Sequence, residues 1–409
     1  MIRSKASTLL CGLLLLISAR ALAEEIVIGM SAAFTGPSRA LGIELYRGSM
    51  AYLESVNRGG GVHGRKVVIR AYDDQYDPTL AVQNTIKLVD DDDAFVLANY
   101  VGTATVTRVL PLLKNYRKNQ MFLFFPFSGA EPQREPPYDD FVFNLRASYH
   151  DETEGLVDHF ARLGRTKISV FYQADAYGRG GWEGVRNALE RRGLRIQGEA
   201  TYRRGTEFSA SLKRQVDILK ATEPDAIISI GSYAACSAFI RDARDSSWNV
   251  PIANLSFVGS AEMADLLVEL GTVRGRDYES NLVNSQVVPL YEDVSLPAVK
   301  EYRQRMDEYG AKIPSPWEAT DYRPLQYSFV SFEGFLNAKL LVKILSELGP
   351  VPAKHRIKEA AESLRGFDLG TGDPISFGPK HHQGSHRVYY TTLHNNRFVP
   401  FADWGQWAK

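Results

Sequence analysis

Four turns that pair glycine with a hydroxyl residue have the clearest capacity for binding chemistry in this sequence. They are Gly102-Thr103, Ser128-Gly129, Gly231-Ser232 and Gly259-Ser260, and each follows an apolar run. A strand that enters a helix through such a turn leaves free backbone N–H groups at its carboxyl end. Those groups and the hydroxyls beside them suit a carboxylate or a carbonyl oxygen. For any one turn alone, an ordinary strand-to-helix connection without a ligand remains the alternative.

Two clusters could suggest a metal ion. Asp73, Asp74 and Asp77 lack the glycine and the terminal Glu of a calcium loop, so we interpret them as a solvated loop and a helix cap. A run with three histidines at 381, 382 and 386 could bind zinc or nickel, but it has no cysteine or matching carboxylate beside it. We expect no metal site and no cofactor.

Motifs for catalysis are missing from the sequence. It contains no Gly-x-Ser-x-Gly, no Walker loop, no His-Glu-x-x-His and no Cys-x-x-Cys. Cys236 stands in an apolar helical segment, which is typical of a packed thiol. We expect no enzyme activity, although an enzyme that uses a two-lobed cleft stays open as the third hypothesis.

The elements that must position the four turns alternate between strand and helix. The first series of expected elements is strand Ile26–Met30, helix Ala40–Val56, strand Lys66–Tyr72, helix 78–89, strand Ala94–Ala98, helix 103–116 and strand Met121–Phe127. The second is strand Lys167–Phe171, helix Gly181–Arg192, strand Leu194–Tyr202, helix Ser209–Lys220, strand Ala226–Ile230, helix Ala234–Asp245 and strand Pro251–Phe257. Such alternation predicts parallel sheets with helices on both faces. The hydroxyl turns fall at equivalent strand ends in the two series, so we expect two facing half-sites in a cleft between two lobes.

Composition and the first residues bound the class of protein. Lys+Arg and Asp+Glu both number 48 in 409 residues, so nothing suggests nucleic acid as a partner. Arg3 and Lys5 precede the apolar run Leu9–Ile17, and Ala21-Leu22-Ala23 offers a cleavage site. We interpret residues 1–23 as a signal peptide cut after Ala23, with a periplasmic mature protein; an N-terminal anchor helix is the alternative.

Several motifs together resemble a known family. They are Phe34-Thr35-Gly36-Pro37, Asn57–Arg65 with its Gly-Gly-Val-x-Gly-Arg stretch, Val67-Val68-Ile69, Tyr72-Asp73-Asp74 and Asp175-Ala176-Tyr177-Gly178. In this order they resemble the leucine/isoleucine/valine-binding family of periplasmic ABC-transporter solute-binding proteins, with the type I periplasmic binding fold. The resemblance covers nearly the whole mature chain.

The resemblance implies an α/β fold of two doubly wound, Rossmann-like lobes joined by a hinge of crossover strands. Each lobe is then discontinuous: 24–145 with 282–378 for lobe 1, and 146–281 with 379–409 for lobe 2. It also implies a ligand enclosed by hinge motion.

Ligand contacts follow from the resemblance position by position. In lobe 1 they are Gly102, Thr103, Ser128 and Gly129; Tyr100 and Phe127 could add aromatic walls. In lobe 2 they are Tyr177 and Tyr233, and Tyr322 falls near an aromatic contact.

One departure from the family affects the ligand class. Family members that bind α-amino acids carry a carboxylate just after the strand that here ends at Phe257, and the nearest acid, Glu262, is expected one helical turn further on. An ammonium buried without a partner would cost several kcal/mol. We therefore expect an apolar or aromatic acid or a neutral amide ahead of a free, branched-chain amino acid.

These observations favour an exported protein that captures a small organic molecule and delivers it to a membrane ABC permease, acting as a monomer. A sensor subunit, with the same cleft docking on a receptor or kinase, is the alternative.

Overall fold

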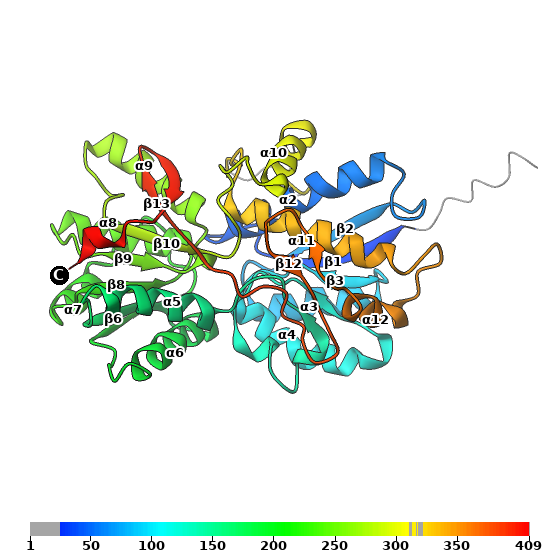
Figure 1. The fold of residues 1–409 in the computed structure, drawn as a ribbon, viewed down its shortest axis with the longest axis horizontal. Coiled ribbons are helices and arrows are strands. Elements are labelled where there is room, and N and C mark those ends of the chain that lie inside the picture. The colour runs from blue at the N-terminus through cyan, green and yellow to red at the C-terminus, as the bar shows by residue number, and fades with distance from the viewer. Residues whose placement is uncertain (1–24, 311–312, 316, 318–321, 409) are drawn as a thin grey trace, which may run out of the picture.

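The computed structural model describes residues 25–310, 313–315, 317 and 322–408, so the expected signal peptide lies outside the described residues. These residues form two α/β halves that lie side by side (Figure 1). Within them, no helix is both long and apolar enough to cross a membrane.

The first half is built on a five-stranded parallel sheet with the order β2-β1-β3-β4-β5. Its strands are β1 (Ile26–Ala32), β2 (Val67–Asp73), β3 (Val96–Ala98), β4 (Leu123–Phe124) and β5 (Val142–Phe143). Its helices are α2 (Arg39–Arg58), α3 (Pro78–Asp90), α4 (Thr103–Asn115), α10 (Pro297–Tyr309), α11 (Phe329–Ser346) and α12 (Ile357–Glu362). The helices α2 and α11 cover one face of the sheet, and α3 and α4 cover the other (Figure 1).

The second half repeats this topology and extends it. Its seven-stranded sheet has the order β14-β13-β10-β9-β8-β6-β7. The strands are β6 (Ile168–Gln173), β7 (Glu199–Tyr202), β8 (Ala226–Ile230), β9 (Ile252–Asn254), β10 (Leu282–Gln286), β13 (Tyr389–His394) and β14 (Arg397–Pro400). The helices are α5 (Tyr149–Arg162), α6 (Ala176–Glu190), α7 (Lys213–Lys220), α8 (Tyr233–Asp245) and α9 (Ser260–Arg274). The strands β6 to β10 are arranged as β1 to β5 are, so both halves are doubly wound with the same order.

The chain passes between the two sheets three times: between β5 and α5, between β10 and α10, and between β13 and a short two-stranded sheet, β11 (Phe367–Asp368) with β12 (Pro374–Ile375). One expected boundary needs correction. The return to lobe 1 at residue 282 is too early, because β10 pairs with β9 and β13 inside the second sheet. The boundaries at 145/146 and 378/379 fall within the first and third crossings and stay a prediction.

In each doubly wound sheet the order in which successive strands are added reverses at one point. In the first sheet it lies between β1 and β3, and in the second between β6 and β8. Ligands of open α/β sheets bind outside the carboxyl ends of strands at this point. Thr103 follows β3 and Ser232 follows β8, so the fold brings the predicted hydroxyl turns to the expected sheet edges.

Candidate functional site in the cleft between the lobes

The turn between β3 and α4 is held in its shape by glycine. Gly102 has φ +104°, and its N–H donates to the Phe127 carbonyl oxygen at 3.1 Å. A Cβ here would lie 2.0 Å from a ring carbon of Tyr76, so the ring covers the turn directly. A side chain at position 102 would therefore be strained in backbone and in packing.

The predicted hydroxyls meet one another. Thr103 Oγ1 lies 2.8 Å from Ser128 Oγ and 3.1 Å from the Tyr149 hydroxyl. Thr103 is 1% exposed, and Ser128 and Tyr149 are fully buried. Burial raises the pKa of the Tyr149 phenol, which keeps it protonated. The hydroxyls thus form a small, satisfied network in this structure.

An aromatic cluster fills the centre of the contact between the lobes. The Phe257 ring centroid lies 4.4 Å from that of Tyr177, 5.4 Å from that of Phe127 and 6.0 Å from that of Tyr76. Tyr177 also packs on Tyr149 at 5.1 Å. Two predicted residues, Phe127 and Tyr177, therefore come together from opposite lobes. The strand that was expected to end at Phe257 ends at Asn254, and Phe257 lies in the short 3-10 helix Ser256–Val258 with its ring fully buried.

A polar chain of side chains joins the lobes beside this cluster. Gln173 Nε2, at the end of β6, donates to the Tyr76 hydroxyl at 3.3 Å. The Tyr202 hydroxyl donates to Gln173 Oε1 at 3.1 Å and accepts from the Ser232 N–H at 3.1 Å. Because Tyr76 belongs to lobe 1 and the others to lobe 2, these hydrogen bonds connect the two lobes.

Tyr100 does not belong to the site, contrary to expectation. Its hydroxyl lies 3.0 Å from Thr85 Oγ1 of α3, and its ring packs in the lobe 1 core. The preceding residue, Asn99, has φ +58°, so the chain turns sharply after β3. The turn sends the Tyr100 side chain into the core rather than toward the other lobe.

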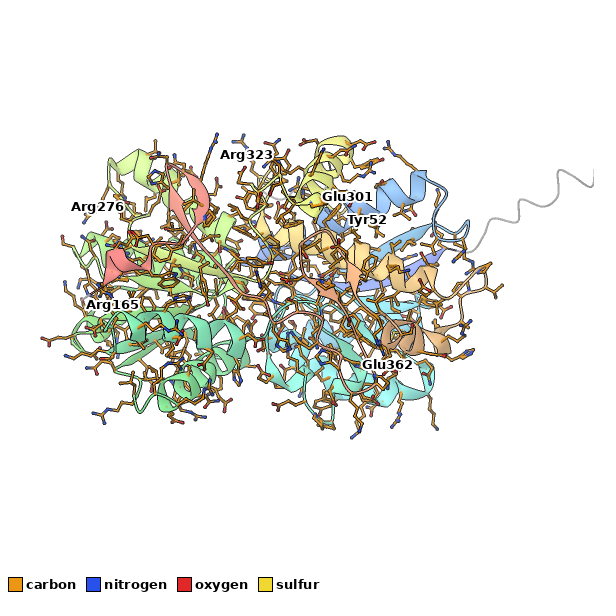
Figure 2. The ribbon with its side chains drawn as sticks, in the orientation of Figure 1. Tyr52, Arg165, Arg276, Glu301, Arg323 and Glu362 are labelled. Carbon is orange, nitrogen blue, oxygen red and sulfur yellow. The ribbon has the colours of Figure 1, made fainter. Side chains whose placement is uncertain are left out.

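The other two tyrosines predicted for the site, Tyr233 and Tyr322, line a cavity between the lobes. The cavity has a volume of about 750 Å³, within the range of small-molecule sites. From lobe 1 it is lined by Arg39 and residues 322–326, and from lobe 2 by Tyr233 and the face of α9. In Figure 2, Arg323 is labelled near the top of the view, between the two halves.

Tyr322 is anchored through a buried acid of α2. Its hydroxyl donates to Glu44 Oε1 at 2.9 Å, and Arg47 Nη1 donates to both oxygens of the same carboxylate at 2.8 and 2.7 Å. Burial raises the pKa of Glu44 above its usual value, while Arg47 opposes the rise. On the other wall, the Tyr233 hydroxyl accepts from the Ala40 N–H at 3.4 Å.

Glu262 enters the same cavity from α9. It is 4% exposed, and within the described residues neither carboxylate oxygen accepts a hydrogen bond. Burial raises its pKa to about 8, and the nearby Glu44 adds to the rise. As expected, Glu262 lies about one helical turn after Phe257, in the first turn of α9, and it borders the cavity with both carboxylate oxygens buried.

The first crossing carries a buried arginine that sequence reasoning missed. Arg146 lies 3.6 Å from Glu333 of α11 and 4.0 Å from Glu152 of α5, and its guanidinium stacks 4.4 Å from the Phe127 ring centroid. It also donates to Ser256, whose N–H donates to Glu152 Oε2 at 2.7 Å. Charges from both lobes therefore meet on the hinge.

Two of the three histidines considered for metal binding, His382 and His386, have structural partners. His382 Nδ1 lies 2.7 Å from the Asp139 carbonyl oxygen and its Nε2 lies 3.0 Å from Glu362, while His386 pairs with Asp151. Across the described residues, no group of three His, Cys, Asp or Glu side chains could hold a metal ion. Burial raises the pKa of the Cys236 thiol to about 12, so it is a packed, protonated thiol.

Comparisons with known proteins agree with this geometry. The sequence pattern of the periplasmic binding protein family matches residues 25–397. An amino acid binding protein of Pseudomonas aeruginosa is 25% identical to this chain over an aligned region. That region makes up 56% of this chain and 59% of the length of that relative. The Leu/Ile/Val/Thr-binding protein of Salmonella typhimurium is 25% identical over 90% of this chain and 97% of its own.

Among solved structures, a possible leucine/isoleucine/valine-binding protein from Rhodopirellula baltica superposes with a TM-score of 0.83 at 30% identity, covering 95% of this chain and 98% of its own. The two-lobed fold and the resemblance to the leucine/isoleucine/valine-binding proteins are thus confirmed. The chain belongs to the periplasmic binding protein family.

Proposed function

We propose that this protein is an exported solute-binding protein that encloses a small organic molecule between its lobes and passes it to a membrane ABC permease. The observation that carries the proposal is the cavity of about 750 Å³ whose walls come from both lobes. A site with one wall on each lobe is complete only when the lobes approach, which couples binding to closure. The names of the relatives, which bind leucine, isoleucine, valine or threonine, support a small organic ligand.

Transport also agrees with the chemistry of the cleft. The Cys236 thiol is buried and protonated, and the Thr103 and Ser128 hydroxyls bond to each other, so none of these three groups is an activated nucleophile. The family and the expected signal peptide support a periplasmic location. In this proposal the mature chain begins at Glu24.

The test is to identify a retained solute and then follow closure. Native mass spectrometry of gently purified protein should find one bound small molecule. After removal and return of that molecule, small-angle scattering should show a more compact protein. Chemical turnover of the solute would favour an enzyme instead, and identical scattering with and without saturating solute would refute capture by closure.

A further inference from the structure

The two walls of the cavity between the lobes carry exposed charges of opposite sign. Lobe 1 contributes Arg39 and Arg323, and lobe 2 contributes Asp265 and Glu269, which lie four residues apart and so share one face of α9. Arg323, Asp265 and Glu269 are exposed, and within the described residues none of these three charges forms an ion pair. A cation of one lobe and two carboxylates of the other therefore border the same gap without contact.

The segment that carries Arg323 is fixed to lobe 1 on both sides of this residue. The Tyr322 hydroxyl and the Leu325 N–H both donate to Glu44 Oε1, at 2.9 and 3.2 Å. Arg47 Nη1 donates to the Leu325 carbonyl oxygen at 2.7 Å. Because Glu44 and Arg47 are buried residues of α2, these bonds make Arg323 move together with lobe 1.

The two acids are equally well fixed to lobe 2. The helix α9 is anchored by Met263 and Leu267, which are fully buried, while Asp265 and Glu269 stay exposed. Burial and the neighbouring Glu269 raise the pKa of Asp265, and Arg323 opposes the rise. The attraction between Arg323 and Asp265 thus acts across the gap although the two groups do not touch.

The lobes already meet at the edge of this cavity. The Tyr233 hydroxyl of lobe 2 accepts from the Ala40 N–H at 3.4 Å. A Cβ at Gly259 would lie 2.7 Å from the side chain of Leu41, so the turn before α9 also packs on α2. Further rotation about the hinge would shorten the gap between the charged walls, whose bases are in contact.

From this arrangement we propose that Arg323 of lobe 1 forms an electrostatic latch with Asp265 and Glu269 of lobe 2, which draws the walls of the cleft together and pairs when the lobes close. The proposal rests on the lobe movement of the proposed function and adds a device that biases it. An exposed ion pair contributes little free energy, so the latch shifts the balance between open and closed protein without locking it. Salt screens such charges, so this balance should depend on ionic strength.

The test measures the separation of the lobes in solute-free protein. Lys300→Cys on α10 and Arg214→Cys on α7 are exposed positions for a pair of fluorophores, and the native Cys236 is buried and stays unlabelled. Single-molecule energy transfer then gives the ratio of closed to open protein. With the native charges, this ratio should fall by roughly two- to fivefold between about 20 mM and about 500 mM salt.

Three variants separate the latch from a general effect of charge. Arg323→Glu replaces attraction by repulsion, so at low salt it should lower the closed-to-open ratio by roughly two- to fivefold and remove most of the salt dependence. The triple variant Arg323→Glu/Asp265→Lys/Glu269→Lys exchanges the signs of the two walls and should restore both. Lys343→Glu is the matched control: it reverses one cation of a surface pair with Glu347 at the far end of α11, and should leave the ratio unchanged.

The outcomes distinguish this proposal from the proposed function. A ratio that ignores Arg323→Glu, is not restored by the triple variant, or responds equally to Lys343→Glu would overturn the latch, while two populations would still show that the lobes move. A single separation that changes neither with salt and charge nor with the solute retained on purification would mean that the lobes do not move, and would overturn the proposed function as well.

Discussion

Arg146 Nη1 lies 3.6 Å from Glu333 Oε1, and this pair ties the first crossing between the lobes to α11 of lobe 1. The same guanidinium faces Glu152 of lobe 2 at 4.0 Å. All three side chains are buried, so each charge depends on the others for compensation. Removing one of these charges from the hinge should therefore be costly.

Arg146→Met should lower the free energy of unfolding by about 3–5 kcal/mol at neutral pH, because it leaves two buried carboxylates unpaired. The pKa of Glu333 is already raised to about 7 by burial, with Arg146 opposing the rise. Without Arg146 the pKa must rise further, so the variant should regain stability as the pH falls and both acids take up protons. Urea unfolding at pH 5 and pH 8 checks this. A loss of the same size at both pH values would contradict the electrostatic account.

Tyr76→Phe should weaken closure more than folding. It removes the hydroxyl that accepts from Gln173 across the cleft, and Gln173 Nε2 keeps its 2.7 Å bond to Asp175. One such bond contributes about 0.5–1.5 kcal/mol, so the affinity for the retained solute should fall roughly two- to tenfold. Tyr100→Phe is the matched control: it breaks a bond to Thr85 inside lobe 1 and should lower stability without changing affinity. Similar affinity losses in both variants would refute a cross-lobe role for Tyr76.

The hydroxyl network of Thr103, Ser128 and Tyr149 can be tested by a substitution that preserves the shape of the side chain. Thr103 is buried, so a long side chain cannot be accommodated there as it could at an exposed strand end. Thr103→Arg should therefore disrupt the packing of the protein as well as any binding. Thr103→Val preserves the shape and leaves Ser128 and Tyr149 short of one partner each, which should cost about 1–3 kcal/mol of stability. If the turn also binds the solute, affinity should fall by more than Ser128→Ala lowers it. Unchanged affinity in Thr103→Val would remove Thr103 from the site.

The sequence predicts much of the scaffold because its signals are local. Asp77 caps α3 through the N–H groups of Thr79 and Leu80, with Pro78 in the first turn, and the helix follows as expected. The helix α5 was missed, although Ser148 and Asp151 form a capping box that marks its start. Because α5 was missed, so were Tyr149, the second hydroxyl partner of Thr103, and Glu152, the acid that faces Arg146.

The site was less predictable because it depends on contacts between distant segments. Thr103 and Ser128 could be paired from the sequence, since the carboxyl ends of neighbouring parallel strands meet at one edge. Tyr76 and Gln173 lie 97 positions apart and on different lobes, and no local pattern links them. Tyr100 was misplaced because a single left-handed residue before it redirects the side chain.

The last prediction concerns the stability cost of Glu262 in the free protein. Its pKa rises from 4.5 to about 8 on folding, so between these values the folded protein binds a proton that the unfolded chain has lost. Stability from this group is therefore present at low pH, declines as the pH rises through that window, and levels off above about pH 8. Glu333 and Asp74, whose pKa values burial raises to about 7, contribute slopes of the same sign in any variant. The difference between wild type and Glu262→Gln isolates the one group: the variant should be the more stable protein above pH 7, and its advantage should shrink toward pH 5. Thermal unfolding across this range measures the difference. A variant less stable than wild type at pH 8 would mean that the carboxylate has a stabilising partner within the fold.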